Sequence, residues 1–271
     1  MSHSVLHSLW PVLLEAMEAR FCHLTERLPS GRCFRHDAVL SCLSGWASDT
    51  FNTVSGIPST FEDVASITAL YRHYRWPASW WLPEQAFADA RRWLVQQGWQ
   101  YAESDMAMAR EMSGLPVMSQ RPGFRVYEVT TTADIQLFGS IMSTIFERDA
   151  PVEAAEVREV YSAMCPPERG QTHWQLLIGV DRDKPVATAS LFIRDGIASI
   201  NDIATHPAHR RQGIGTAMFE ATLQRIHDSG AAWCVLQASE AGQSLYARQG
   251  FSALGMIDTW NLSENDERAD R

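Results

Sequence analysis

Lysine and paired cysteines are scarce in this sequence of 271 residues. Lys184 is the only lysine, and no Cys-x-x-C pair is present. The cysteines are five, an odd number, and they are scattered along the chain: Cys22, Cys33, Cys42, Cys165 and Cys234. Such spacing fits neither a disulfide framework nor a zinc motif. We therefore expect reduced thiols and no metal site.

A membrane-spanning run and a secretion signal are also missing. No stretch of about 18 apolar residues is found. The first basic side chain other than histidine is Arg20, and Glu15 and Glu18 interrupt the apolar run before it, a pattern that does not fit a signal peptide. We expect a cytoplasmic protein without a membrane partner.

Positive charge is in short supply, since the formal net charge is -9. A protein that binds nucleic acid neutralises phosphates with a basic face, so no nucleic-acid partner is expected. Hydrophobic residues make up 45% and charged residues 20% of the chain, which is the balance of a soluble globular protein.

Two common phosphate-binding motifs are absent. The sequence has no G-x-x-x-x-G-K-[ST], so an NTPase P-loop is excluded. A dinucleotide fingerprint G-x-G-x-x-G would begin at Gly213 and Gly215, but its third position is Met218, and that motif normally opens a domain.

The pattern of apolar residues and turn residues predicts an α/β protein. Thr60 with Asp63 reads as a capping box, Pro83 as the first turn of the next helix, and Thr132 as a helix cap. Helices are predicted at 9–27, 60–74, 84–97, 132–146, 152–164, 213–228 and 241–249. Strands are predicted at 51–57, 79–82, 99–108, 124–129, 174–180, 186–193, 197–205, 232–238 and 251–262, while 38–46 fits a short helix or a strand.

The two halves of the chain share one order of elements. The strand-helix-strand-helix-strand series at 51–108 recurs at 197–262, and Gln97-Gly98-Trp99 corresponds to Gln249-Gly250-Phe251. Two copies of one fold explain this repeat; two unrelated α/β segments with a similar helix end are the alternative. The expected division is a first domain at 1–115, a linker at 116–123, a second domain at 124–262 and a polar tail at 263–271.

One loop between a strand and a helix is suited to an anion. Gly213 and Gly215 let the backbone approach a ligand closely, and the first amides of a helix are unpaired and favour negative charge. Arg210 and Arg211 add positive charge. The loop therefore predicts a pyrophosphate site.

The same residues carry a family resemblance. Arg210-x-x-Gly213-x-Gly215 follows Ile203-Ala204-Thr205-His206-Pro207, and Ala241-x-x-x-Leu245-Tyr246-x-x-x-Gly250-Phe251 comes after it. This combination resembles the acetyl-CoA-binding motif and the following helix and strand of the GNAT superfamily of N-acetyltransferases. The resemblance covers about 124–262, and it implies two GNAT-like domains, each with a mixed, mainly antiparallel sheet flanked by helices.

The resemblance also implies roles for individual residues. The backbone amides of Gln212, Gly213, Ile214, Gly215 and Thr216 would hold the pyrophosphate of CoA. Ile203, Ala204 and Thr205 would pair with the pantetheine arm as an added strand does, and this strand would polarise the thioester carbonyl. Tyr246 matches the tyrosine that protonates the departing thiolate, and a phenol with a pKa of about 10 suits a general acid.

The general base has two candidates. Asp202 is the acidic residue nearest to the expected pantetheine strand, and Glu240 begins the next helix. Asp202 could instead be an ordinary strand-end carboxylate, and Glu240 could serve only the helix dipole. Cys234 lies on a neighbouring strand rather than in the motif, so transfer through a covalent enzyme intermediate is disfavoured.

The first half lacks this loop. Its corresponding segment reads Ile57-Pro58-Ser59-Thr60, and Pro58 has no amide to offer. It resembles the degenerate N-terminal domain of tandem GNAT proteins, which is not expected to hold CoA. Four polar or aromatic residues of this half are candidates for the wall of an acceptor cleft, namely Asn52, Trp76, Trp80 and Trp81. The alternative is that the tryptophans belong to the core.

The function expected from these residues is transfer of an acetyl group from acetyl-CoA to a primary amine of a small molecule, by direct attack. The alternatives are a CoA-binding regulator without turnover, and acetylation of a protein or an aminoacyl group. One cofactor per chain is expected, in a monomer or a homodimer.

Overall fold

The computed structural model describes residues 3–114, 121–168, 170 and 173–263. Its contacts divide the chain into two compact units. Unit 1 contains Met1–Ala16 and Met108–Leu254, and unit 2 contains Met17–Ala107 and Gly255–Arg271. The predicted domain boundaries stay a prediction, and most of the expected linker and tail lies outside the described residues.

The chain passes between the units inside three elements rather than in loops. These are helix α1 (His3–Glu26), strand β5 (Gln100–Glu111) and strand β11 (Ser252–Leu262). Each unit therefore includes a piece of chain from the other end of the sequence.

Unit 2 has a strand order of β1-β2-β3-β4-β11-β5. Strands β3 and β4 are parallel, whereas the β1–β2, β2–β3 and β4–β11 pairs are antiparallel. The remaining elements of this unit are β1 (Arg32–His36), β2 (Val39–Leu43), β3 (Thr53–Ser55), α2 (Phe61–Tyr74), β4 (Ala78–Pro83) and α3 (Ala88–Gln96).

The core of unit 2 lies where α2 and α3 pack on one face of these strands. Trp80 is fully buried, stacks edge-on against Trp99 at 5.4 Å between ring centroids, and donates its indole N–H to the carbonyl of Gly56. Tyr71 of α2 and Leu94 of α3 complete the same cluster. Burial of such large side chains is the main source of stability.

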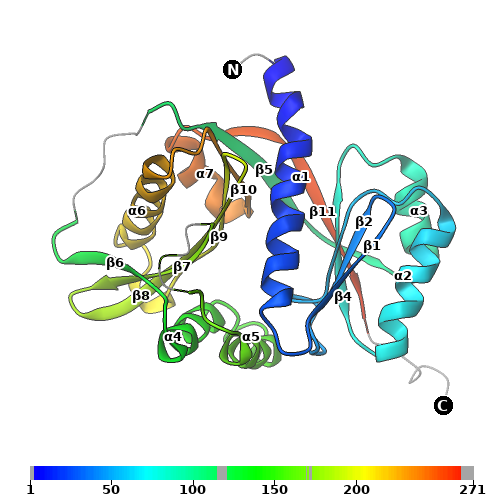
Figure 1. Ribbon diagram of the computed structural model, residues 1–271, viewed down its shortest axis with the longest axis horizontal. Coiled ribbons are helices and arrows are strands. Elements are labelled where there is room, and N and C mark those ends of the chain that lie inside the picture. Colours follow the sequence, from blue (N-terminus) through cyan, green and yellow to red (C-terminus); the bar gives the residue numbers. More distant parts are fainter. Residues whose placement is uncertain (1–2, 115–120, 169, 171–172, 264–271) are drawn as a thin grey trace. The chain divides into compact units, whose positions relative to one another are not determined.

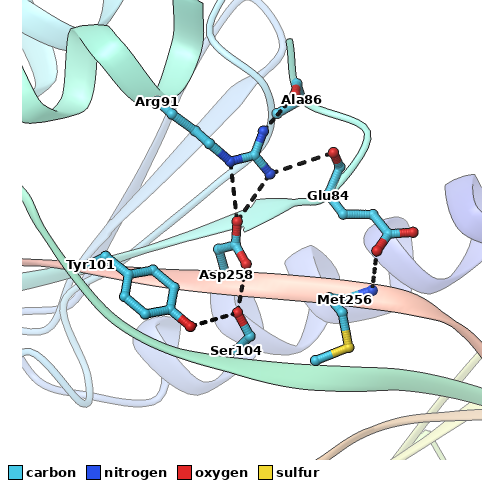
Figure 2. A network of polar contacts seen from close by, with 7 residues as sticks. All are labelled: Glu84, Ala86, Arg91, Tyr101, Ser104, Met256 and Asp258. Carbon is cyan, nitrogen blue, oxygen red and sulfur yellow. Dashed lines mark hydrogen bonds and ion pairs between the residues drawn. The ribbon is translucent and has the colours of Figure 1, made fainter. Parts of the chain in front are cut away.

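Polar contacts fasten β11 inside unit 2. Arg91 of α3 donates to the carboxylate of Asp258, with nitrogen-oxygen distances of 2.9 and 3.2 Å (Figure 2). Ser104 of β5 donates to the other oxygen of this carboxylate at 2.6 Å, and Met256 and Glu84 exchange two bonds of 2.9 Å. The last strand is thus held by side chains as well as by its ladder.

Unit 1 has a strand order of β5-β10-β9-β8-β7-β6. The pairs from β6 to β9 are antiparallel, and β9 with β10 is parallel. Helices α4 and α6 lie on opposite sides of these strands (Figure 1). The elements are β6 (Phe124–Glu128), α4 (Thr132–Ser143), α5 (Pro151–Ala163), β7 (Trp174–Asp181), β8 (Lys184–Arg194), β9 (Ile197–Thr205), a 3-10 turn (Pro207–His209), α6 (Ile214–Asp228), β10 (Trp233–Ala238) and α7 (Glu240–Arg248).

The predicted repeat is present as an order of elements and as a detail of backbone geometry. The series β3-α2-β4-α3-β5 corresponds to β9-α6-β10-α7-β11. Both α3 and α7 end at a glycine in the left-handed region, Gly98 at φ +86° and Gly250 at φ +84°. The amide of the aromatic residue that follows bonds back to the helix in each case, Trp99 to Leu94 and Phe251 to Tyr246. This 6→1 hydrogen bond is the one that defines the Schellman C-cap motif.

Most predicted elements are confirmed, with differences at several of their ends; helix α1, for example, already begins at His3 rather than at 9. The undecided segment 38–46 contains a strand, and β1 before it was not predicted. Helix α3 begins at Ala88 rather than at 84, because Pro83 still pairs with Ile257 of β11. Helix α4 is capped by Thr131 rather than Thr132, since the Thr131 hydroxyl and the Asp134 carboxylate form the capping box.

Candidate functional site at the start of helix α6

The N-terminus of α6 has the form of an anion site. Its N-cap, Gly213, adopts φ +78° and has no side chain that could satisfy the first amides. A Cβ at Gly215 would lie 3.3 Å from the hydroxyl of Thr205, so this glycine lets the helix start close against the end of β9. The first amides of a helix that starts in this way favour an anionic ligand.

The corresponding helix of the first half is closed to such a ligand. The Asp63 carboxylate accepts hydrogen bonds from the amides of Ser59 and Thr60, each at 2.8 Å, and the Thr60 hydroxyl accepts from the Asp63 amide at 3.2 Å. Asp63 is 4% exposed. A carboxylate of the protein thus already accepts from the amides just before this helix.

Three side chains of the predicted loop have different surroundings. Arg210 donates from Nε to the carbonyl of Thr205 at 3.1 Å, which ties the loop to the end of β9. Arg211 is exposed and has φ +58°, so Arg211 and Gly213 both leave the right-handed region within a few residues of the helix. The side-chain amide of Gln212 donates from Nε2 to the carbonyl of Ala208 at 3.3 Å.

An arginine outside the predicted motif supports the same loop. Arg121 donates to the carbonyl of Gln212 at 2.6 Å and grips both carboxylate oxygens of Asp181, at 2.9 and 3.1 Å. The Arg121 guanidinium also lowers the pKa of Asp181. Sequence reasoning placed Arg121 in the linker, and its only available signal was an arginine shortly before β6.

Strands β9 and β10 separate next to this helix. Their register runs from Ile197 with Trp233 to Ser199 with Val235, although β9 continues to Thr205 and β10 to Ala238. Ile203, Ala204 and Thr205 lie beyond the end of that register, while Ala204 and Thr205 still pair with β8 on their other side. The predicted pantetheine-binding residues are therefore at the opening between the two strands.

Asp202 lies at a bulge immediately before this opening. It has φ +53°, a left-handed conformation that is uncommon for a residue other than glycine, and the β8–β9 register shifts beside it. The Ser190 hydroxyl donates to its carboxylate, and the Thr188 hydroxyl donates to its carbonyl at 2.9 Å. A strained and fully supported position of this kind is typical of functional sites.

Tyr246 packs beneath the first turns of α6. Its ring lies 4.8 Å from that of Phe219 and 6.3 Å from that of Phe251, and the residue is 9% exposed. A Cβ at Gly242, one turn earlier in α7, would come within 2.8 Å of the Tyr246 ring. Gly242 therefore leaves the space in which this ring is seated.

The other two chemical candidates differ sharply in exposure. Glu240 is exposed at the first position of α7. Cys234 is fully buried, and burial raises the pKa of its thiol well above the ordinary value. A buried neutral thiol is a poor nucleophile.

The candidate acceptor residues of the first half divide between core and surface. Asn52 is fully buried and accepts from Ser44 while donating to the carbonyls of Trp46 and Pro77. Trp80 is in the core, as described above. Trp81 is partly exposed against Phe21, and Trp76 stacks on Tyr74 at 4.7 Å. Asn52 and Trp80 thus have structural roles.

The geometry agrees with a comparison against known families. Residues 141–251 match the acetyltransferase (GNAT) family. The chain carries a GNAT domain. The matched region of this domain contains the α6 loop, the opening between β9 and β10, and Tyr246. No curated protein sequence matches the chain significantly.

Solved structures share the fold of both units. A GCN5-related N-acetyltransferase from Kribbella flavida is 18% identical, with a TM-score of 0.70 over 95% of this chain and 98% of its own. A putative acetyltransferase of the GNAT family from Novosphingobium aromaticivorans is 12% identical, with a TM-score of 0.58 over 94% and 99%. A tandem GNAT protein from the clavulanic acid biosynthesis pathway is 13% identical, with a TM-score of 0.53 over 95% and 97%.

In the described part of the chain, no helix combines the length and the apolar character needed to cross a membrane.

Proposed function

We propose that the GNAT domain transfers an acetyl group from acetyl-CoA to a primary amine of a small molecule, by direct attack of the amine on the thioester. The observation that carries the proposal is the start of α6, with its uncapped amides beside the opening of β9 and β10. The pyrophosphate of CoA would accept from the amides of 212–216, and its pantetheine arm would add to the free edge of Ile203–Thr205.

Two side chains have the chemistry that acetyl transfer requires. Tyr246 is the proposed general acid for the departing thiolate. Asp202, held by Ser190, is the preferred base, acting on the ammonium of the acceptor through water; the exposed Glu240 is the second candidate. The burial of Cys234 supports direct attack over a covalent enzyme intermediate.

A small cationic acceptor suits the charge of the chain. A net charge of -9 attracts an amine that is protonated in solution and opposes docking of nucleic acid. We propose a single cofactor site per chain, because Asp63 fills the equivalent helix start in the first half and Leu94 takes the place of Tyr246 at the matching C-cap. A cytoplasmic monomer or homodimer is part of the proposal.

The proposal is tested by thiol release from acetyl-CoA across a panel of amines. We expect turnover with at least one amine, and Gly213→Glu should abolish it because the added carboxylate repels the pyrophosphate. Gly213→Gln introduces a side chain of similar size at the same positive φ but without the charge, so it shows how much of the loss is due to backbone strain. Gly114→Glu is the control, because it adds the same carboxylate at a glycine with open space around it. Undiminished turnover in Gly213→Glu would exclude the cofactor site.

A CoA-binding regulator without turnover is the second candidate. Tyr246→Phe distinguishes the two functions, because it should lower kcat about 100-fold or more while CoA binding measured by calorimetry stays unchanged. CoA binding without consumption of any amine, by the unaltered protein, would favour the regulator.

A further inference from the structure

Three of the five cysteines lie close together in unit 2, although no sequence motif predicts this cluster. Cys22 lies in the second half of α1, Cys33 in β1, and Cys42 directly opposite Cys33 in β2. Their sulfur atoms all lie within 4.8 Å of one another, and those of Cys33 and Cys42 are 3.5 Å apart. Three separate elements therefore bring their thiols to one point.

These separations are close to those of a thiolate metal site. A zinc-sulfur distance of about 2.3 Å in tetrahedral geometry puts neighbouring sulfurs roughly 3.8 Å apart. The Cys33–Cys42 separation of 3.5 Å lies just below that value, and the 4.8 Å limit on the other separations exceeds it by about 1 Å. Binding an ion would thus require shifts of the sulfur atoms of about 1 Å or less, without rearrangement of the backbone.

The surroundings allow an ion to enter and to be held. Cys42 is fully buried at the base of the cluster, whereas Cys22 and Cys33 are partly exposed. The carboxylate of Glu18 is bound by Arg35, so it is not the natural fourth ligand.

We propose that Cys22, Cys33 and Cys42 bind one thiophilic metal ion, Zn²⁺, through three thiolates, with the fourth position open to solvent. Soft thiolate ligands select Zn²⁺ and Cu⁺ over hard cations such as Mg²⁺. Binding displaces the thiol protons to solvent, so the affinity rises with pH. The ion would join the end of α1 to the β1–β2 hairpin.

The cluster is tested on the full chain, reduced and stripped of metal with a chelator. Zn²⁺ is titrated against a colorimetric chelator, and Co²⁺ serves as a spectroscopic probe of thiolate ligation. We expect one zinc ion per chain, a charge-transfer band with Co²⁺ and a higher Tm with zinc. Cys22→Ser and Cys33→Ser should each weaken binding about 100-fold or more.

The exposed Cys165 gives the matched control, since Cys165→Ser should leave the zinc stoichiometry and affinity unchanged. Circular dichroism verifies the fold of each variant, and the two partly exposed positions are preferred because Cys42→Ser alters a buried site. Two outcomes would overturn the proposal: no zinc bound at micromolar concentration, or equal zinc binding by Cys22→Ser and the unaltered protein.

Discussion

At the residue scale, the candidate site depends on positions that touch no reacting atom. Arg121 holds the carbonyl of Gln212, Gly242 leaves room for the ring of Tyr246, and Ser190 bonds the carboxylate of Asp202. Such side chains fix the geometry of the groups that would bind CoA or move a proton. We propose that they are positioning residues, whose replacement affects different kinetic constants.

Replacing Arg121 tests this distinction. Arg121→Ala removes a charge-assisted bond to the loop backbone and leaves Asp181 without its partner. If the proposed function holds, the KM for acetyl-CoA should rise about tenfold with kcat changed much less, since the loop that binds the cofactor loses a charged donor that holds it in place. Steady-state kinetics with varied acetyl-CoA provide the measurement.

Arg125→Ala is the matched control, because the Arg125 pair with Asp183 is largely exposed. Its KM should be unchanged, as expected of a surface ion pair. An unaltered KM in Arg121→Ala, or an equal rise in both variants, would remove Arg121 from the cofactor site.

At the element scale, the starts of α2 and α6 show how one position in a repeated fold serves stability or ligand binding. At the start of α2, the Thr60 hydroxyl accepts from the Asp63 amide and the Asp63 carboxylate from the amides of Ser59 and Thr60, whereas the N-cap of α6 is a glycine without a side-chain cap. The first arrangement stabilises the unit without a ligand. The second gives up that stabilisation and becomes available to an anion.

Asp63→Asn should therefore destabilise the protein by about 1 kcal/mol or more, and Thr60→Ala by about 1 kcal/mol, in urea unfolding at pH 7. Ser59→Ala is the control, since it keeps the amide that donates to Asp63. Equal unfolding midpoints for all three variants would contradict the assigned role of the capping box.

The same change has a pH signature. Burial raises the pKa of Asp63, but the hydrogen bonds from the amides of Thr60 and Ser59 outweigh it, so the net pKa is lowered. The contribution of Asp63 is thus present above its unfolded pKa of about 4 and is lost as pH falls through the folded value. When the pH falls from about 5 to 3, the free energy of unfolding should decrease less in Asp63→Asn than in the unaltered protein.

At the scale of the whole molecule, the chain cannot be divided at one point. Unit 1 contains the end of β5 from the first half, and unit 2 contains most of β11 from the second half. Ile257 to Leu262 pair along β4, and the bonds of Asp258 to Arg91 and Ser104 add to this ladder (Figure 2).

Arg91→Ala should lower the free energy of unfolding by about 1–3 kcal/mol, because it leaves a partly buried carboxylate without its cation. Arg92→Ala, on the same helix, removes an exposed pair with Asp89 and should change stability by less than about 0.5 kcal/mol. The free energies of unfolding of the two variants are compared by thermal or urea unfolding. Indistinguishable losses would show that Asp258 needs no partner.

Local signals in the sequence were sufficient for most elements and for the repeat. Glycine after α3 and α7, the Thr60–Asp63 pair and the glycines of the α6 loop each act over a few residues, so periodicity and capping rules detect them. The edge strand β1 was missed, because its exposed residues Arg32, Arg35 and His36 give little alternation of polar and apolar side chains.

Long-range features were not predictable in this way. The pairing of β11 with β4, the grip of Arg121 on Gln212 and the meeting of three cysteines all join residues far apart in the sequence or in unrelated elements. No spacing rule encodes them, since they depend on how the strands are ordered in each unit. Pro83 shows the same limit: pairing with β11 keeps it in a strand although the residue itself suits a helix start.

The late arrival of β11 also governs how this protein can be made. During synthesis, β1 to β4 leave the ribosome early, together with α2 and α3. Strand β4 then lacks its neighbour β11 until residues 257–262 have been synthesised. During that interval the nascent chain exposes an unpaired strand edge, which is the kind of surface that recruits chaperones and promotes aggregation. Completion of unit 2 therefore waits until β11 has been synthesised.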